Sequence, residues 1–172
     1  MTSSPAAPPC HSRGLPPVTG PDPRVLVLGS FPSVLSLSHG EYYGNPRNRF
    51  WAVIEDLFGI SALLPYTERC QYLTGAGIAL WDVIASCSRP GSADSRIRDA
   101  VPSDIAGFIR AHPTVRLIVL NGSAAGRFYH RAGEVPGIPF VILPSTSPAN
   151  AAVSYKKKVR AWGVVKAACG RA

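Results

Sequence analysis

The sequence predicts an α/β protein: a three-layer α/β/α sandwich around a central four-stranded parallel sheet. Four short apolar runs indicate strands that are buried on both faces, as in parallel sheets: residues 24–28, 78–81, 117–120 and 140–143. Segments with apolar residues at helical spacing separate these runs, and such alternation is typical of a parallel sheet. The chain of 172 residues has the length of one domain.

Helices are predicted over four segments: residues 47–58, a short helix that Ser103 caps, residues 122–130, and a last helix from about residue 151. In the first of them, Pro46 stands at the start, and Asn45 just before it is expected to be the cap. The polar residues 88–103 predict an exposed loop. Residues 1–22 are rich in Pro, Ser and Ala, which predicts a disordered tail before a domain of residues 23–172.

Composition favours a basic globular protein. Hydrophobic residues make up 46%, and no apolar run approaches the roughly 20 residues of a membrane span. The net charge of +8 and the pI near 9.7 favour an anionic partner, most commonly nucleic acid. The four cysteines form no CxxC pair, so we expect neither a metal nor a disulfide framework, and a cytoplasmic location.

The carboxyl ends of the predicted strands carry small, polar residues. These ends are residues 29–33 (Gly-Ser-Phe-Pro-Ser), 81–83 (Trp-Asp-Val), 121–123 (Asn-Gly-Ser) and 144–150 (Pro-Ser-Thr-Ser-Pro-Ala-Asn). In an open parallel sheet the ligand binds in the crevice beyond these ends. Each end alone is ordinary turn chemistry, but four together predict a binding site without a dinucleotide or P-loop glycine pattern.

A second polar segment leads into the first predicted helix. Residues 42–51 read Tyr-Tyr-Gly-Asn-Pro-Arg-Asn-Arg-Phe-Trp and combine aromatic faces, amides and cations. Core packing does not require this combination, whereas a nucleobase and its phosphates do.

These motifs resemble the signature segments of the uracil-DNA glycosylase superfamily, and within it the hypoxanthine-DNA glycosylase group. The resemblance covers about residues 25–162 and rests on the Gly-Ser-Phe-Pro turn, residues 42–51 and the Ser-Thr-Ser-Pro-Ala-Asn segment. It implies a monofunctional glycosylase that flips a deaminated base, hypoxanthine or uracil, out of the duplex and hydrolyses the N-glycosidic bond with water. It implies no metal or other cofactor and no obligate protein partner, so we expect a monomer.

The resemblance implies catalytic and base-binding residues, with one departure. Much of the superfamily has a catalytic Asp or Asn where this chain has Phe31, so the water-positioning role passes to Asn48, with Asn45 and Asp82 as alternatives. Asp82 is also expected to accept a hydrogen bond from the base edge. Tyr43 is expected to stack on the base, with Phe31 as another wall and Asn121 as a weaker contact.

Contacts to the DNA backbone are expected from hydroxyls and lysines. They are Ser30, Ser33, Ser145, Thr146, Ser147, Lys156 and Lys157. The residues expected to wedge into the duplex are Ala149 and Asn150, which are small for that task. Structural explanations exist for each candidate: Asn48 as a helix first-turn residue, Asp82 as a turn cap, a tyrosine in the core, and the lysines as a solvated helix face.

Two other functions remain open from the sequence. Phe31 in the catalytic position leaves room for a non-catalytic nucleic-acid-binding module on the same fold. A nucleotide or nucleoside hydrolase is a third possibility, although the positive charge and the lysines favour a polymeric substrate.

Overall fold

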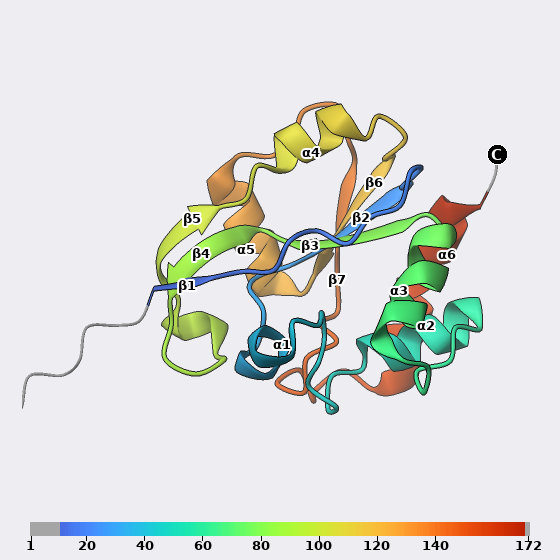
Figure 1. The fold of residues 1–172 in the computed structure, drawn as a ribbon, viewed down its shortest axis with the longest axis horizontal. Helices are drawn as coiled ribbons and strands as arrows, with labels where there is room; N and C mark the ends of the chain where they lie inside the picture. The colour runs from blue at the N-terminus through green and yellow to red at the C-terminus, as the bar shows by residue number, and fades with distance from the viewer. Residues whose placement is uncertain (1–10, 171–172) are drawn as a thin grey trace, which may run out of the picture.

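The central sheet has the predicted strands, all parallel, in the order β3-β2-β6-β7. A computed structural model of the chain describes residues 11–170 (Figure 1). The strands are β2 (Val25–Gly29), β3 (Ile78–Asp82), β6 (Leu117–Asn121) and β7 (Phe140–Leu143). Their carboxyl ends therefore meet at one edge of the sheet.

Two layers of helices cover the sheet, which confirms the three-layer sandwich. Alternate residues of β2 divide between them: Val25 and Val27 face one core, and Leu26 and Leu28 face the other. The first core is closed by α2 (Phe50–Phe58), α3 (Tyr66–Gly75) and α6 (Tyr155–Cys169), and the second by α4 (Ile105–Ala111) and α5 (Ser123–Ala132).

A second sheet lies beside the sandwich. It overturns two expectations, the exposed loop of residues 88–103 and the disordered tail over residues 11–22. It is antiparallel in the order β1-β4-β5, from β1 (His11–Arg13), β4 (Ile84–Ser88) and β5 (Arg98–Pro102). Residues 88–103 are thus not simply an exposed loop, because they contain β5 and the 3₁₀ turn η1 (Asp94–Arg96). All of β5 is exposed, so no apolar alternation in the sequence marks it.

The predicted disordered tail is wrong for residues 11–22. Besides β1, the Gly14 amide donates to Ala85 O (2.8 Å), and Val18 exchanges two backbone hydrogen bonds of 2.8 Å with Leu80. This segment is rich in proline, yet it satisfies backbone groups at the edges of both sheets. The remainder of the predicted tail, residues 1–10, lies outside the described residues.

Several helix limits differ from the predictions. Helix α2 begins at Phe50, three residues later than expected, and α6 begins at Tyr155 behind a Ser154 cap. Asp104, not Ser103, caps α4 by accepting from the Gly107 amide (2.9 Å). The sequence did not reveal α1 (Val34–His39) or α3. Across residues 11–170, every helix is too short or too polar to cross a bilayer.

Candidate active site

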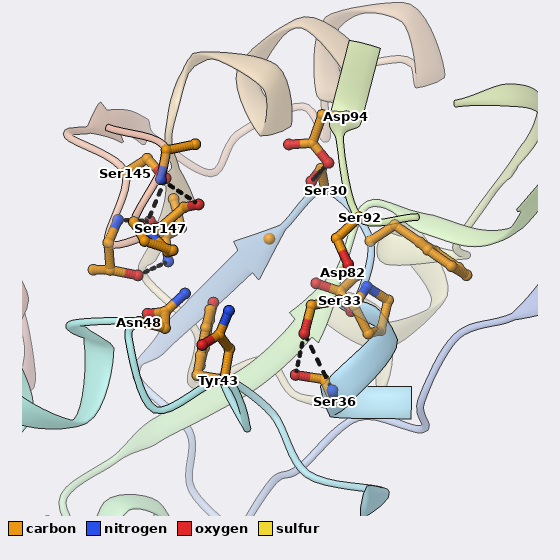
Figure 2. Close-up of a pocket in the computed structure, with 18 of the residues that line it drawn as sticks. Ser30, Ser33, Ser36, Tyr43, Asn48, Asp82, Ser92, Asp94, Ser145 and Ser147 are labelled. Carbon is orange, nitrogen blue, oxygen red and sulfur yellow. Dashed lines mark hydrogen bonds between the residues drawn. The ribbon is translucent and has the colours of Figure 1, made fainter. Parts of the chain in front are cut away.

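A pocket of about 360 Å³ opens at the carboxyl edge of the parallel sheet. Its lining includes the turn after β2, Asp82, residues 92–94, Asn121, residues 145–149 and, from the segment before α2, Tyr42, Tyr43, Asn45 and Asn48. In Figure 2, Asn48 lies below Ser145 and Ser147, and Tyr43 stands between Asn48 on one side and Ser33 and Ser36 on the other. Its size falls within the range of ligand sites, roughly 300–1,000 Å³.

Two glycines allow the close approaches that shape this pocket. A Cβ on Gly29 would stand 2.5 Å from Asp82 Oδ1, so only glycine lets this carboxyl group lie against the end of β2. Gly122 has φ of 99° and would place a Cβ 2.7 Å from Ser145 Cβ. Both positions therefore require glycine for spatial reasons, and Gly122 also for its backbone conformation.

The turn after β2 is held by its own hydroxyls. Ser33 Oγ accepts from the Ser36 amide and donates to Ser36 Oγ (both 3.1 Å), and Ser36 Oγ accepts from the Gly44 amide (3.0 Å). Ser30 Oγ donates to Asp94 Oδ1 (2.8 Å). Ser30 and Ser33, expected to bind phosphate, thus have internal partners, and their hydroxyls connect the segments that line the pocket.

The two adjacent tyrosines have different environments. Tyr42 is a core residue whose hydroxyl donates toward the Leu15 and Pro16 carbonyls (3.1 and 2.9 Å). Tyr43 lines the pocket, adopts the left-handed φ of 56°, and stacks one ring face on Phe50 at 4.1 Å between centroids. Its buried hydroxyl has no hydrogen-bond partner among the described residues. Such a strained backbone and an unpartnered hydroxyl are features of functional sites.

Asn48 occupies the last turn before α2. Its Oδ1 accepts from the Phe50 amide (2.9 Å) and so satisfies one of the free amides at the start of the helix. This is the structural role that the sequence offered as the alternative to catalysis. The Nδ2 of Asn48 has no hydrogen-bond partner among residues 11–170, and the residue lines the pocket. Asn45 does not cap α2, because its Oδ1 accepts from the Arg47 amide in the preceding turn (3.0 Å). That turn delays the helix start to Phe50.

Asp82 places a buried carboxyl group at the floor of the pocket. The residue is 5% exposed, and Oδ2 has no hydrogen-bond partner within residues 11–170. Burial, followed by repulsion from Asp94, raises the pKa of Asp82 from its ordinary 3.8 to about 7, against a smaller opposite effect of Arg89. A carboxyl group with this pKa can accept a proton near neutral pH, which is typical of catalytic groups.

Phe31 contributes little ring surface to a bound base. It touches the pocket but is 7% exposed, and it packs with Ile84, Cys87 and Ile97 beneath the antiparallel sheet. Its Cε2 also lies 3.3 Å from the position of a Cβ on Gly14. Phe31 therefore anchors the first turn to the second sheet. This contact could not be predicted, because the strands of that sheet were not predicted.

Asn121 and Thr146 form an internal clamp between β6 and the loop after β7. Asn121 Nδ2 donates to Thr146 Oγ1 (2.9 Å), and Asn121 Oδ1 accepts from the Thr146 amide (3.0 Å). Thr146 is fully buried and its carbonyl accepts from the Arg49 amide (2.9 Å). Thr146 is thus buried and bound internally, whereas the phosphate contact expected of it would need an exposed group.

The neighbours of Thr146 remain available at the pocket rim. Ser145 Oγ accepts from the Ser147 amide (3.2 Å), and both residues are partly exposed. Ala149 is an exposed rim residue. Asn150 lies outside the pocket lining, and its side chain donates back to Ser145 O (3.2 Å).

The lysines of α6 divide by burial. Lys158, buried, donates from Nζ to Asn150 O (2.8 Å) and supports this loop. Lys156 and Lys157 are exposed and lie outside the pocket lining. They are free to meet a polyanion, whereas Lys158 is structural.

Three residues near the pocket were not predicted from the sequence as site residues. Ser92 and Asp94 line it, and Arg89 is buried against Phe31 with its Cζ 5.1 Å from the ring centroid. The only signal was the polar or charged character of these three residues, in a segment predicted to be an exposed loop. Among residues 11–170, no three His, Cys, Asp or Glu side chains gather as a set of possible metal ligands.

Comparison with known proteins gives one consistent family. The sequence profile of the Uracil DNA glycosylase superfamily matches residues 16–166. A protein of Methanosarcina acetivorans described as hypoxanthine DNA glycosylase is 37% identical over 154 residues, 89% of this chain and 96% of its own. A protein of Methanosarcina barkeri with the same description is 31% identical over 151 residues, 87% and 94% of the two chains.

A solved structure agrees with this assignment. The solution NMR structure of a candidate uracil DNA glycosylase from Methanosarcina acetivorans matches with a TM-score of 0.82 at 35% identity. The match covers 93% of this chain and 99% of that chain. The motifs, the sheet order and these likenesses agree, and the chain belongs to the uracil DNA glycosylase superfamily.

Proposed function

We propose that this protein is a monofunctional DNA glycosylase of base excision repair that excises hypoxanthine first and uracil second. The observation that carries the proposal is one pocket that contains Tyr43, Asn48 and Asp82, in a chain 31–37% identical to two proteins described as hypoxanthine DNA glycosylases. We further propose that it acts as a monomer in the cytoplasm without a cofactor.

The reaction begins when the deaminated base leaves the stack and enters the pocket. Flipping costs a few kcal/mol, and less for a mispaired base, which favours deaminated sites. We place the base against Tyr43, whose ring is held from behind by Phe50. Asp82 lies at the pocket floor, where its carboxylate accepts either from the ring N–H of hypoxanthine or from the attacking water.

Hydrolysis of the N-glycosidic bond needs an oriented water and a stabilised leaving base. Asn48 is suited to orient the water, because its Oδ1 is fixed by the Phe50 amide while its Nδ2 has no partner in the part of the chain that the structure describes. The helix-start hydrogen bond and the catalytic task are compatible, since a carbonyl oxygen has two lone pairs. The fixed amide offers the orientation on which catalysis by positioned polar groups depends.

The exposed groups around the pocket are assigned to the DNA strand. Ser145 and Ser147 stand at the rim to meet the phosphates beside the lesion, and Lys156 and Lys157 extend this contact. Ala149, with Asn150 behind it, is the proposed wedge into the duplex. Ala149 offers little apolar area, so we expect efficient excision mainly where the base pair is already weakened.

The test is cleavage of labelled duplexes that contain one deoxyinosine or one deoxyuridine, followed by alkali to break abasic sites. We expect abasic sites from both, more from deoxyinosine, and the same yield with EDTA. Asn48→Ala should remove this activity, whereas the control Gln71→Ala, on the exposed surface of α3, should retain it. Binding of both duplexes without any abasic site would favour the non-catalytic module instead.

A further inference from the structure

The loop that follows β4 is fastened to the first turn of the pocket. Arg89 Nη2 donates to Pro32 O, Ser30 Oγ donates to Asp94 Oδ1 (2.8 Å), and the Val34 amide donates to Ser92 Oγ (2.9 Å). Ser92 and Asp94 themselves line the pocket, as Figure 2 shows. Residues 92–94 thus form one wall of the site, and Arg89 fastens the same loop from outside the lining.

Arg89 contributes a buried positive charge to this wall. Its side chain is 3% exposed, its guanidinium lies over the Phe31 ring, and Nε donates to Gly91 O (2.9 Å). Nη1 is 3.8 Å from Asp94 Oδ1 and has no hydrogen-bond partner in the part of the chain that the structure describes. Burial lowers the pKa of Arg89, but guanidinium groups keep their charge at neutral pH.

Burying a cation with incomplete hydrogen bonding costs stability. A neutral side chain could fill the same space and hold the Pro32 carbonyl, so packing alone does not account for the charge. The positive charge of Arg89 favours the ionised form of Asp82 and so lowers its pKa, but less than burial and Asp94 raise it.

Four ionisable groups face Asp82. Asp94 and Arg89 come from the loop after β4, and Tyr42 and Tyr43 from the segment before α2. Burial, and then the charge of Asp82, raises the pKa of both tyrosines, so they are neutral at working pH. Asp94 and Arg89 are therefore the neighbours whose charges act on Asp82, and they act in opposite directions.

We propose that Arg89 is a positioning residue of the proposed excision site: it holds the turn of residues 30–33 in place, and its positive charge favours the ionised form of Asp82. Asp94 opposes this charge while it binds Ser30, so the pair sets the pH at which Asp82 becomes an acceptor. The inference rests on the proposed function only for its consequence in catalysis, because the charge of Asp82 can be measured without any reaction.

The direct test is carboxyl ¹³C NMR titration of the whole protein, with the Asp82 signal identified by its loss in Asp82→Asn. In Arg89→Gln the titration midpoint should move up by about one pH unit, and in Asp94→Asn down by a similar amount. Arg89→Lys, which keeps the charge, should leave the midpoint near that of the wild type. Arg96→Gln removes an exposed cation from the same loop and serves as the matched control.

The consequence for catalysis is read from the pH dependence of single-turnover excision of hypoxanthine. The acidic limb should follow the NMR midpoint in each variant, while circular dichroism remains that of the wild type. Unmoved midpoints in both Arg89→Gln and Asp94→Asn would overturn the inference. If Arg89→Gln does not fold, Asp94→Asn decides alone through its downward shift. Shifted midpoints in a protein without excision activity would overturn the proposed function and keep the electrostatic role.

Discussion

Replacing Asp82 by Asn should make the protein more stable above neutral pH while impairing excision. In the folded protein the carboxyl group is nearly buried and its pKa is raised from 3.8 to about 7. A raised pKa means that the folded state binds a proton more tightly than the unfolded chain. The stability that this proton gives is fully present below about pH 4 and is lost as the pH rises through 7.

The magnitude follows from the same shift. Each unit of pKa corresponds to about 1.4 kcal/mol. The rise from 3.8 to about 7 therefore costs the folded state up to about 4 kcal/mol once Asp82 is ionised. Asparagine has nearly the same shape and never ionises, but its NH₂ group also needs a partner. We expect Asp82→Asn to retain at least about 2 kcal/mol of the stability that the wild type loses when Asp82 ionises.

The assay is equilibrium unfolding in urea, followed by tryptophan fluorescence at pH 4 and at pH 8.5. The advantage of Asp82→Asn over the wild type should be larger at pH 8.5 than at pH 4 by about 2–4 kcal/mol. Other carboxyl groups titrate in both proteins, so they cancel in this comparison. If the stability advantage of Asp82→Asn is the same at the two pH values, Asp82 does not have a raised pKa in the folded protein.

Four further results are expected. Asn48→Ala should reduce the single-turnover rate by about 100-fold or more with duplex binding retained, and a rate within threefold of wild type would move the water to another residue. Tyr43→Phe should keep the stacked ring and be neutral or stabilising by up to about 1 kcal/mol in urea unfolding, because it removes an unpartnered hydroxyl; Tyr43→Ala should weaken lesion binding by about 1–3 kcal/mol. Gly29→Ala should fold less stably and excise slowly, since its Cβ would displace Asp82, and wild-type excision would contradict the close approach. Lys156→Ala with Lys157→Ala should weaken binding of damaged and undamaged DNA alike, with the salt slope smaller by about one per lost contact, and an unchanged slope would place α6 away from the duplex.

The four strands of the parallel sheet could be predicted because each has an apolar run of its own, although β7 is only partly buried. Residues of β2 and β6 are apolar in succession, which only a sheet covered on both faces requires. The positions of Asp82 and Asn121 in one pocket follow from the same logic, because parallel strands bring their carboxyl ends together. The strand β5 had no comparable signal, since its stability comes from backbone pairing with β4 while its side chains face solvent.

The sequence by itself determined the α/β/α class, the edge of the sheet that carries the site, and most of the residues in it. Tertiary structure alone decided what each side chain does there. Thr146 was expected to contact the DNA backbone but is buried, and Asn121 of β6 binds its side chain and its amide. Lys158 is buried beside the exposed Lys156 and Lys157, and its Nζ donates to Asn150 O. Arg89 read as a loop cation but is a buried charge beside the pocket. The physical reason is that local residue pattern fixes backbone conformation, whereas burial, hydrogen-bond partners and pKa depend on segments that only the folded chain brings into contact.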